Sequence, residues 1–474
     1  MSFECMLLED LAAPLKNSIV GGPFGSNLVS KDYADNGVPV IRGQNMGGKW
    51  VSGDFVFVSQ EKALQLQQNK ARPGDVVFTQ RGTLGQVSIV PASPYAEYIV
   101  SQSQMKITVD QSKADSQFIY YLFRSEVQLR YILNSAIQTG VPHTNLGILR
   151  KTPVTVPSLS TQKAIAVFLG LLDDRITLLH ETNATLEAIA QALFKSWFVD
   201  FDPVHANAAA KADQHSGGNG QTGTSPAGSA SAPGSQTDPT AQRTPQALDP
   251  ATTALFPDSF EESELGLVPK GWRRLAFTDT VKVIGGGTPK TSMPEYWDGD
   301  IPWFSVVDAP VITDVFVIDT AKHISASGLS NSSTKLLTKG TTIISARGTV
   351  GRLALVGKEM AMNQSCYGLQ GKAADAYFTY FSTYRLVESL KQRSHGSVFD
   401  TITTETMKGV TVIYPDVNVI HAFEVALHPV MERIKENLEQ AQTLTQLRDT
   451  LLPRLISGQL RLPEAQDQLQ DTLA

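Results

Sequence analysis

The second half of this sequence repeats the motifs of the first half in the same order. Residues 71–90 (ARPGDVVFTQRGTLGQVSIV) align with residues 337–356 (LTKGTTIISARGTVGRLALV), which places Arg81 over Arg347 at an offset of 266. The flanking matches are Gly21-Gly22 with Gly285-Gly286, Val38-Pro39 with Ile301-Pro302, Gln102-Ser103 with Gln364-Ser365, and Val141 and Thr144 with Val398 and Thr401. A pattern that recurs within 474 residues predicts two similar folding units rather than one large domain.

Each half ends in a heptad pattern that predicts an unusually long helix. Apolar residues at alternating steps of four and three extend from Ile165 to Trp197, and an equivalent set follows at an offset of 258. The two seams consist of Ile165, Leu169, Leu172, Ile176, Leu179, Asn183, Leu186, Ala190, Leu193 and Trp197, and of Phe423, Leu427, Val430, Ile434, Asn437, Ala441, Leu444, Arg448, Leu451 and Leu455. Seams of roughly 50 Å favour a coiled coil between the two helices, although each helix could instead pack on its own globular unit.

Asn183 and Asn437 interrupt these apolar seams. A buried asparagine can fix the register of paired helices, whereas one at a helix distortion can face solvent. The second helix is expected to end between Pro453 and Gly458.

The globular parts, at about 1–158 and 260–416, alternate short β-branched segments with turns. Each repeated segment predicts a strand, a glycine-containing turn and a second strand, with Gly74 and Gly340 opening the two hairpins. One helix per unit is expected, near 117–135 and 374–393. The predicted fold class is therefore α+β, with two similar units in one chain.

Residues 207–253 consist almost entirely of Ala, Gly, Ser, Thr, Pro, Gln and Asp, with no aromatic residue. This composition predicts a flexible linker with no role beyond tethering. The two cysteines, Cys5 and Cys366, are too few for a disulfide framework, and the chain shows no signal peptide and no apolar run long enough to span a membrane. A cytoplasmic location is therefore expected.

Motifs for catalysis are not visible in the sequence. GGGTPKT at 285–291 has Pro289 where a phosphate loop needs glycine, and no dinucleotide fingerprint or Asn-Pro-Pro-aromatic motif occurs. The eight histidines form no zinc motif, and PDSFEESE at 257–264 lacks the downstream acid-x-Lys of a metal-dependent nuclease. The sequence predicts no catalytic, metal or cofactor site, unless one is assembled from distant residues.

In order, these motifs resemble the specificity subunit of type I restriction-modification enzymes. The segments that carry the resemblance are GGPFGSNL (21–28), VPVIRGQNM (38–46), PGDVVFTQRGTLGQ (73–86), FPDSFEESELGLVPKGW (256–272), GGGTPKTSMPEYWDGDIPWFS (285–305), RGTVG (347–351), NQSC (363–366) and LRDTLLPRLISGQL (447–460). Each is weak alone, but two sets in the same order are specific.

The resemblance implies two target-recognition domains, each reading one half of a split site in double-stranded DNA, separated by two helices that pair antiparallel. It also implies two modification subunits, which bring S-adenosylmethionine, and two motor-nuclease subunits, which use ATP and Mg²⁺. The expected boundaries are 1–158 and 256–416 for the recognition domains, 159–205 and 417–460 for the helices, 206–255 for the linker and 461–474 for a tail. The linker is longer than the family commonly has.

Forty Lys and Arg against forty-six Asp and Glu give a net charge of -6, so DNA binding requires local contacts or shared ones. Paired helices would then act as a spacer that fixes the gap between two DNA segments. Partner subunits would neutralise much of the phosphate charge, while the recognition domains contact bases.

Base readout uses polar side chains on loops. The candidates in the first domain are Lys31, Arg42, Gln44, Asn45, Gln80, Arg81, Thr83, His143, Thr144 and Asn145, and those in the second are Lys290, Thr291, Trp303, Ser305, Arg347, Thr349, Arg352, His395, Ser397, Asp400 and Thr401. Because the Arg-Gly-Thr at 81–83 recurs at 347–349 in domains that would read different sequences, a phosphate contact or a structural turn is favoured there. Trp50, Trp272, Trp297 and Trp303 are expected to serve packing.

Two other classes remain open from the sequence. A single-chain modification or nuclease enzyme would need the cofactor and metal motifs that are not found. A coiled-coil scaffold would use the helices without binding DNA. A duplex pulldown with and without a modification subunit separates these classes from a specificity subunit.

Overall fold

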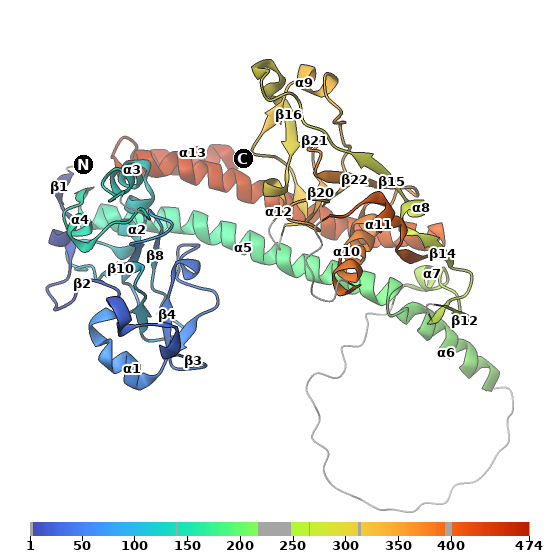
Figure 1. Cartoon of the computed structure of the whole chain (residues 1–474), viewed down its shortest axis with the longest axis horizontal. Coiled ribbons are helices and arrows are strands. Elements are labelled where there is room, and N and C mark those ends of the chain that lie inside the picture. Colours follow the sequence, from blue (N-terminus) through green and yellow to red (C-terminus); the bar gives the residue numbers. More distant parts are fainter. Residues whose placement is uncertain are drawn as a thin grey trace, which may run out of the picture. The chain divides into compact units, whose positions relative to one another are not determined.

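The computed structural model describes residues 3–138, 141–216, 248–264, 266–310, 314–393 and 401–473. The chain divides into two compact units, here called unit 1 (Met1–Thr177 with Gln442–Ala474) and unit 2 (Leu178–Ala441). Two long helices, α5 (Leu159–Phe198) and α12 (Val417–Ile456), each contribute one part to each unit. Figure 1 shows the elements in chain order.

Unit 1 contains two main sheets. The first is antiparallel, in the order β2 (Ile19–Gly21), β10 (Gln104–Ile107), β7 (Val76–Thr79) and β8 (Val87–Ile89). The second has the order β3 (Tyr33–Ala34), β5 (Val56–Val58), β4 (Val38–Ile41), β9 (Tyr98–Val100) and β6 (Lys70–Ala71). A ribbon of β1 (Glu4–Leu7) and β11 (Pro153–Val156), and the helices α1 (Gln60–Gln65), α2 (Ser116–Arg124), α3 (Glu126–Asn134) and α4 (Leu146–Arg150), complete its globular part.

Unit 2 repeats this plan with a larger first sheet and a smaller second sheet. Its first sheet has the order β15 (Val281–Gly285), β22 (Cys366–Gly371), β19 (Thr342–Ser345), β20 (Leu353–Val356) and β17 (Phe316–Val317), and its second β18 (His323–Ile324), β16 (Trp297–Phe304) and β21 (Ala361–Met362). Two ribbons pair β12 (Phe260–Ser263) with β13 (Gly266–Pro269) and β14 (Arg273–Ala276) with β23 (Thr411–Tyr414). The helices are α6 (Asp202–Ser216), α7 (Pro250–Thr253), α8 (Phe277–Thr280), α9 (Ala326–Ser330), α10 (Ala376–Arg393) and α11 (Thr404–Lys408).

The internal repeat predicted from the sequence is confirmed by the strand order. β2-β10-β7-β8 corresponds to β15-β22-β19-β20, and the parallel pair β4-β9 corresponds to β16-β21. α2 packs on β7 and β8, as α10 packs on β19 and β20. The repeated glycines share one cause: a Cβ at Gly22 or at Gly286 would lie 1.9 Å from a carbonyl oxygen, that of Ser101 or of Asn363. The fold is α+β, with two similar units.

The predicted single helix at 117–135 is broken in the structure. Ser125 has an extended backbone, with ψ of 146°, and stands between α2 and α3. Its hydroxyl donates to the carbonyl oxygen of Leu122 at 2.6 Å and caps the start of α3. In unit 2 the corresponding α10 is continuous to Arg393, as the sequence predicts.

The first long helix is shorter than the expected 159–205. α5 ends at Phe198, and the backbone turns at Phe201, which has φ of 56°, before α6 begins at Asp202. α6 then continues to Ser216, so the first residues of the expected linker are helical. The central part of that linker, 217–247, lies outside the described residues. At the C-terminus, α12 runs through Pro453 and α13 (Leu462–Leu473) occupies the expected tail.

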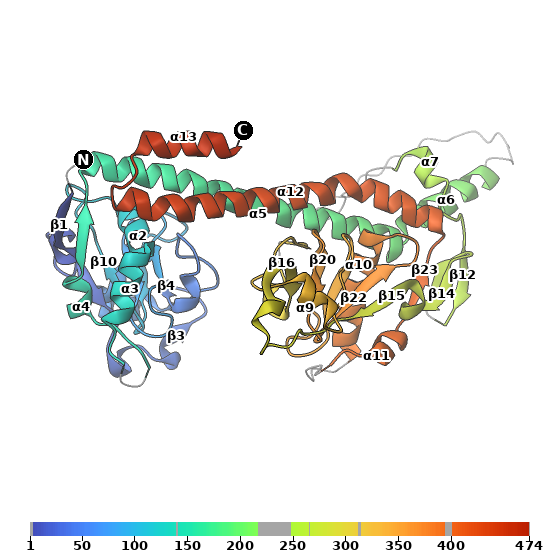
Figure 2. The ribbon, with the colours of Figure 1, turned by 90° about the horizontal axis from the view of Figure 1, so that it is seen from above.

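In unit 2 the two long helices pair antiparallel (Figure 2). The side-chain amide of Asn437 donates to Oδ1 of Asn183 at 2.9 Å, and the amide of Asn183 donates to the carbonyl oxygen of Ile434 at 3.1 Å. Further along, Trp197 contacts Phe423 with ring centroids 5.6 Å apart. Because the residue numbers on α12 fall as those on α5 rise, the pair is antiparallel. Both asparagines are buried, which confirms that they lie on the paired seam.

Candidate nucleic-acid interface

The hairpin between β7 and β8 presents Arg81 and Thr83 to solvent, as the hairpin between β19 and β20 presents Arg347 and Thr349. The glycines that recur in these loops are Gly82 and Gly85, with φ of 94° and 89°, and Gly348 and Gly351, with φ of 78° and 81°. Residues with a Cβ rarely adopt such angles. The recurrence of the motif therefore follows from the shape of the turn, which presents one arginine at the same place in each unit.

A third segment joins each hairpin. Arg81 forms a backbone bridge with His143, and Arg347 forms one with Thr401. The backbone N–H of Thr144 donates to the carbonyl oxygen of Gln80 at 3.0 Å. In the structure, therefore, His143 is the equivalent of Thr401. The sequence alignment, which set Thr144 over Thr401, was wrong by one residue.

A short turn recurs after the β4 and β16 strands. In unit 1, Oδ1 of Asn45 accepts a hydrogen bond from the backbone N–H of Arg42 at 3.0 Å. In unit 2, Oδ2 of Asp308 accepts one from the backbone N–H of Ser305 at 2.8 Å. The same hydrogen bond thus closes the turn in both units and holds the two residues between its ends.

The exposed residue of this turn differs between the units. Gln44 occupies it in unit 1, where its amide also donates to the carbonyl oxygen of Asp54 at 3.1 Å. Val307 occupies it in unit 2, with 85% of its surface exposed. Sequence reasoning missed Val307 because only polar side chains were considered. An apolar group can contact the methyl group of thymine, while an amide can read adenine.

The turn lies beside the hairpin in each unit. A Cβ built on Gly43 would lie 3.9 Å from Oε1 of Gln86, which follows the hairpin loop of unit 1. Arg352, at the corresponding place in unit 2, donates from Nη2 to the carbonyl oxygen of Pro310 at 3.1 Å, just after the turn. Hairpin loop, turn and bridging segment therefore form one surface in each unit, which we call the loop surface.

The glycine-rich segments that follow β2 and β15 are hydrogen-bonded to the glutamines that precede β10 and β22. Gln102 donates from Nε2 to the carbonyl oxygens of Gly25 at 2.6 Å and Leu28 at 2.9 Å. At the corresponding place in unit 2, the hydroxyl of Thr288 donates to Oε1 of Gln364. Matching residues thus anchor this segment in both units.

The sequence candidates separate by exposure. Those on the surface are Lys31, Gln44, Arg81, Thr83, Lys290, Thr291, Arg347 and Thr349, and those half-buried are Arg42, Gln80, His143, Asn145, Ser305, Arg352 and Thr401. Asn45, Thr144 and Trp303 are buried. His395, Ser397 and Asp400 lie outside the described residues.

Three of the candidates have structural partners that explain their presence. The amide of buried Asn45 donates to the carbonyl oxygens of Ser52 and Asp54, both at 3.0 Å. Asn145 caps α4 by accepting from the backbone N–H of Ile148 at 2.9 Å. Trp303 donates from Nε1 to the carbonyl oxygen of Gly287 at 3.0 Å inside unit 2. These side chains shape the loops, and the packing role expected for Trp303 is what the structure shows.

Among the residues that the structure describes, no three His, Cys, Asp or Glu side chains lie close enough together to hold a metal ion. Within those same residues, no helix combines the length and the apolar character that a membrane span requires.

The fold and the doubled loop surface define a protein with two recognition units on one chain. The family model described as type I restriction modification DNA specificity domain matches the chain twice, at residues 25–188 and 269–440. The chain therefore belongs to this family.

Curated relatives and a solved structure agree with this assignment. The HindI specificity subunit of Haemophilus influenzae is 29% identical over 451 residues, which cover 92% of this chain and 97% of that protein. The MjaIX specificity subunit of Methanocaldococcus jannaschii is 30% identical over 159 residues, 33% of this chain and 37% of that one. The crystal structure of an S subunit from M. genitalium matches with a TM-score of 0.52 at 14% identity and covers 96% of both chains, which shows the shared fold.

Proposed function

We propose that this chain is the non-catalytic DNA-specificity subunit of a type I restriction-modification complex. The observation that carries the proposal is the doubled loop surface, in which one backbone scaffold presents different exposed side chains in the two units. Each unit then reads one half of a bipartite site in double-stranded DNA. The paired helices set the gap between the two halves.

Arg81 and Arg347 are proposed to contact phosphates. They occupy the same place on the two loop surfaces and are exposed. A contact shared by domains that read different sequences carries no sequence information, which is the property of a phosphate contact.

Side chains that differ between the loop surfaces are proposed to read bases. The clearest pairs are Gln44 with Val307 and Gln86 with Arg352. Gln44 can form hydrogen bonds where Val307 offers only apolar contact, and Gln86 and Arg352 differ in donors and acceptors, so the two surfaces can prefer different base edges. The other exposed candidates, Lys31, Thr83, Lys290, Thr291 and Thr349, complete the proposed contacts.

The partners proposed are two modification subunits, which supply S-adenosylmethionine and the methyl transfer, and two motor-nuclease subunits, which use ATP and Mg²⁺. The long helices carry exposed apolar residues suited to docking: Val167 and Leu171 on α5 in unit 1, and Val425 on α12 in unit 2. Val167 and Val425 are separated by the offset of 258, so they occupy equivalent places on the two helices. Equivalent apolar faces fit two copies of one partner. The complex is proposed to act in the cytoplasm.

Reconstitution tests the assignment. The purified chain is incubated with DNA and S-adenosylmethionine, with and without a modification subunit, and methylated sites are mapped by sequencing. Sequence-specific methylation only in the presence of that subunit supports the proposal. Methylation by the chain alone would instead show an enzyme, and DNA binding by neither mixture would show a scaffold.

An insertion tests the spacer role. Four residues added to α5 near Thr182 should lengthen the gap between the half-sites and leave their sequences unchanged, because the helices set distance and the units set identity. Methylated sites with the wild-type gap would refute the spacer.

A further inference from the structure

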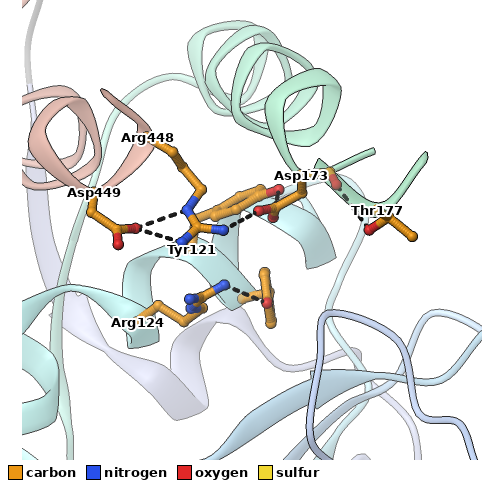
Figure 3. Close-up of polar contacts among 7 residues, drawn as sticks. Tyr121, Arg124, Asp173, Thr177, Arg448 and Asp449 are labelled. Carbon is orange, nitrogen blue, oxygen red and sulfur yellow. Dashed lines mark hydrogen bonds and ion pairs between the residues drawn. The ribbon is translucent and has the colours of Figure 1, made fainter. Parts of the chain in front are cut away.

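A buried ion pair joins the two long helices in unit 1 (Figure 3). Nη1 of Arg448 on α12 donates to Oδ1 of Asp173 on α5 at 2.6 Å, and the hydroxyl of Tyr121 on α2 donates to Oδ2 of the same carboxylate at 2.7 Å. The two charged side chains are only 11% and 10% exposed. Asp449 lies on the other side of the guanidinium, 2.7 Å from Nη2. Asp173 therefore depends on Arg448 for its balancing charge.

The pKa shifts of Arg448 and Tyr121 agree with the dependence of Asp173 on Arg448. Burial opposes the charge of Arg448, but the hydrogen bonds and charges of Asp173 and Asp449 outweigh burial and hold the pKa of the guanidinium above its ordinary value. Burial, followed by the neighbouring carboxylate of Asp173, raises the pKa of Tyr121, so that this hydroxyl stays protonated and can donate.

The equivalent positions in unit 2 are apolar. The offset of 258 that relates the two helices carries Asp173 to Met431 and relates Ala190 to Arg448. Met431 and Ala190 are fully buried in one hydrophobic cluster. The same place in the repeated helix pair is thus an ion pair in one unit and an apolar contact in the other.

The asparagine pair shows the same asymmetry. The offset carries Asn183 to Ala441 and relates Leu179 to Asn437. Ala441 and Leu179 are buried, as are the two asparagines. Asp173 with Arg448 and Asn183 with Asn437 therefore meet only in the pair of α5 with α12, because each equivalent position carries an apolar residue.

We propose that these two polar pairs make α5 select α12 and reject a second copy of α5, and make α12 reject a second copy of itself. The apolar seams alone offer no such choice, because their phases are nearly identical. In a pair of two α5 helices in the same register, each Asp173 would face Ala190 and each Asn183 would face Leu179. In a pair of two α12 helices, each Arg448 would face Met431 and each Asn437 would face Ala441.

The cost of such self-pairing has a simple origin. A buried charge or amide without its partner is strongly unfavourable, and a symmetric pair of identical helices would contain every such defect twice. Replacing both members of a buried ion pair by apolar residues is, in contrast, often neutral for stability. The polar pairs therefore act on the choice of partner more than on stability, and the occupant they exclude is a second copy of this chain.

The chain itself supplies the substitutions for a test. The variant Asp173→Met, Arg448→Ala, Asn183→Ala, Asn437→Leu gives each position the residue found at its equivalent on the other helix. A protease site inserted in residues 217–247 allows the full-length, folded protein to be cleaved after purification. The two pieces are then held together only by their contacts.

Cleaved protein is mixed with a ¹⁵N-labelled copy in graded urea until the label is distributed over the pairs, and native mass spectrometry then counts mixed and self-paired species. The wild type should form mixed pairs almost exclusively. The symmetrised variant should show at least about tenfold more self-pairs, as expected when the difference in affinity between partners is removed. The control Arg385→Ala, Glu388→Ala removes an exposed ion pair on α10 and should behave as wild type.

Either of two results would overturn the proposal: self-pairs of the wild type in statistical proportion, or a symmetrised variant with the wild-type distribution. The thermal midpoint of the uncleaved variant should stay close to that of the wild type. If the fourfold variant does not fold, each polar pair is tested by its own double variant in the same experiment. These are Asp173→Met with Arg448→Ala and Asn183→Ala with Asn437→Leu.

Discussion

The loop surfaces and the long helices diverge in opposite ways between the two units. On the loop surfaces the scaffold is shared, while exposed side chains such as Gln44 and Val307 differ. On the helices the buried side chains differ. Reading two DNA sequences requires one frame with exchangeable contacts, whereas pairing two similar helices correctly requires buried differences.

The ends of the helix pair show this divergence most clearly. In unit 2, Phe194, Trp197 and Phe198 of α5 surround Phe423, with centroid distances of 5.8, 5.6 and 5.0 Å. The equivalents in unit 1, related by the offset of 258, are the aliphatic residues Leu452, Leu455, Ile456 and Ile165. At this place the helix pair of unit 2 is therefore aromatic, whereas the equivalent residues in unit 1 are aliphatic and buried.

The largest effect is expected from breaking that ion pair on one side only. Arg448→Met should destabilise unit 1 by about 3–5 kcal/mol, because it leaves the Asp173 carboxylate buried without its counter-charge. The double variant Asp173→Met, Arg448→Ala should lie within about 1 kcal/mol of the wild type, since the apolar pair of unit 2 replaces it. Urea denaturation measures both. Equal losses in the single and double variants would show that packing, and not charge balance, matters at this position.

The next effect is a pH dependence confined to unit 2. Burial, outweighing the backbone hydrogen bonds from Phe378 and its neighbours, raises the pKa of Glu424 to about 7. Its equivalent in unit 1 is Ala166, which does not titrate.

A folded-state pKa above the unfolded value of 4.5 means that the folded unit holds the proton more tightly. This contribution to stability is complete below pH 4.5 and is lost as the pH rises through 7. Glu424→Gln should remove a decline on the order of 2–3 kcal/mol between pH 5 and 8. Denaturation followed by tryptophan fluorescence, with Glu388→Gln at a half-buried residue as control, measures it. A wild-type slope that survives in Glu424→Gln would place the titration elsewhere.

The smallest effect is expected on DNA affinity, from removing the arginine that the two loop surfaces share. Arg81→Gln and Arg347→Gln should each weaken DNA binding by the reconstituted complex without changing the preferred sequence. Loss of one phosphate contact lowers the slope of log affinity against log salt by about 1. Anisotropy titrations of cognate and mutated duplexes at several salt concentrations test this. A changed base preference in either variant would make that arginine a base reader.

The sequence predicts the scaffold well because the scaffold depends on local patterns. The β7–β8 and β19–β20 hairpins, the glycines at 22 and 286 and the two long helices all follow from repeated motifs and heptad spacing. The break of α5 before Asp202 was not predicted, because the aromatic cluster that holds Phe201 and Trp272 in unit 2 is formed by residues distant in sequence.

The candidate site was predicted less well, because exposure and partners depend on tertiary structure. Asn45 and Asn145 have the residue types of base readers, but their side chains bind neighbouring backbone groups. The turn closed by Ser305 and Asp308 has the same geometry as the turn closed by Arg42 and Asn45, although the accepting side chain is Asp in one and Asn in the other. Asp173 lies one residue from the seam, so the heptad pattern does not mark it as the partner of Arg448, which is 275 residues away.

The central claim is that each unit reads its own half of one DNA site. Residues 20–155 are exchanged for the corresponding segment of a related specificity subunit, and the chimera is expressed with its modification subunit in a host without other methylation. Methylome sequencing should show one new half-site, with the other half-site and the gap unchanged, because each unit has its own core and loop surface. A change in both half-sites, or a specificity related to neither parent, would contradict the account.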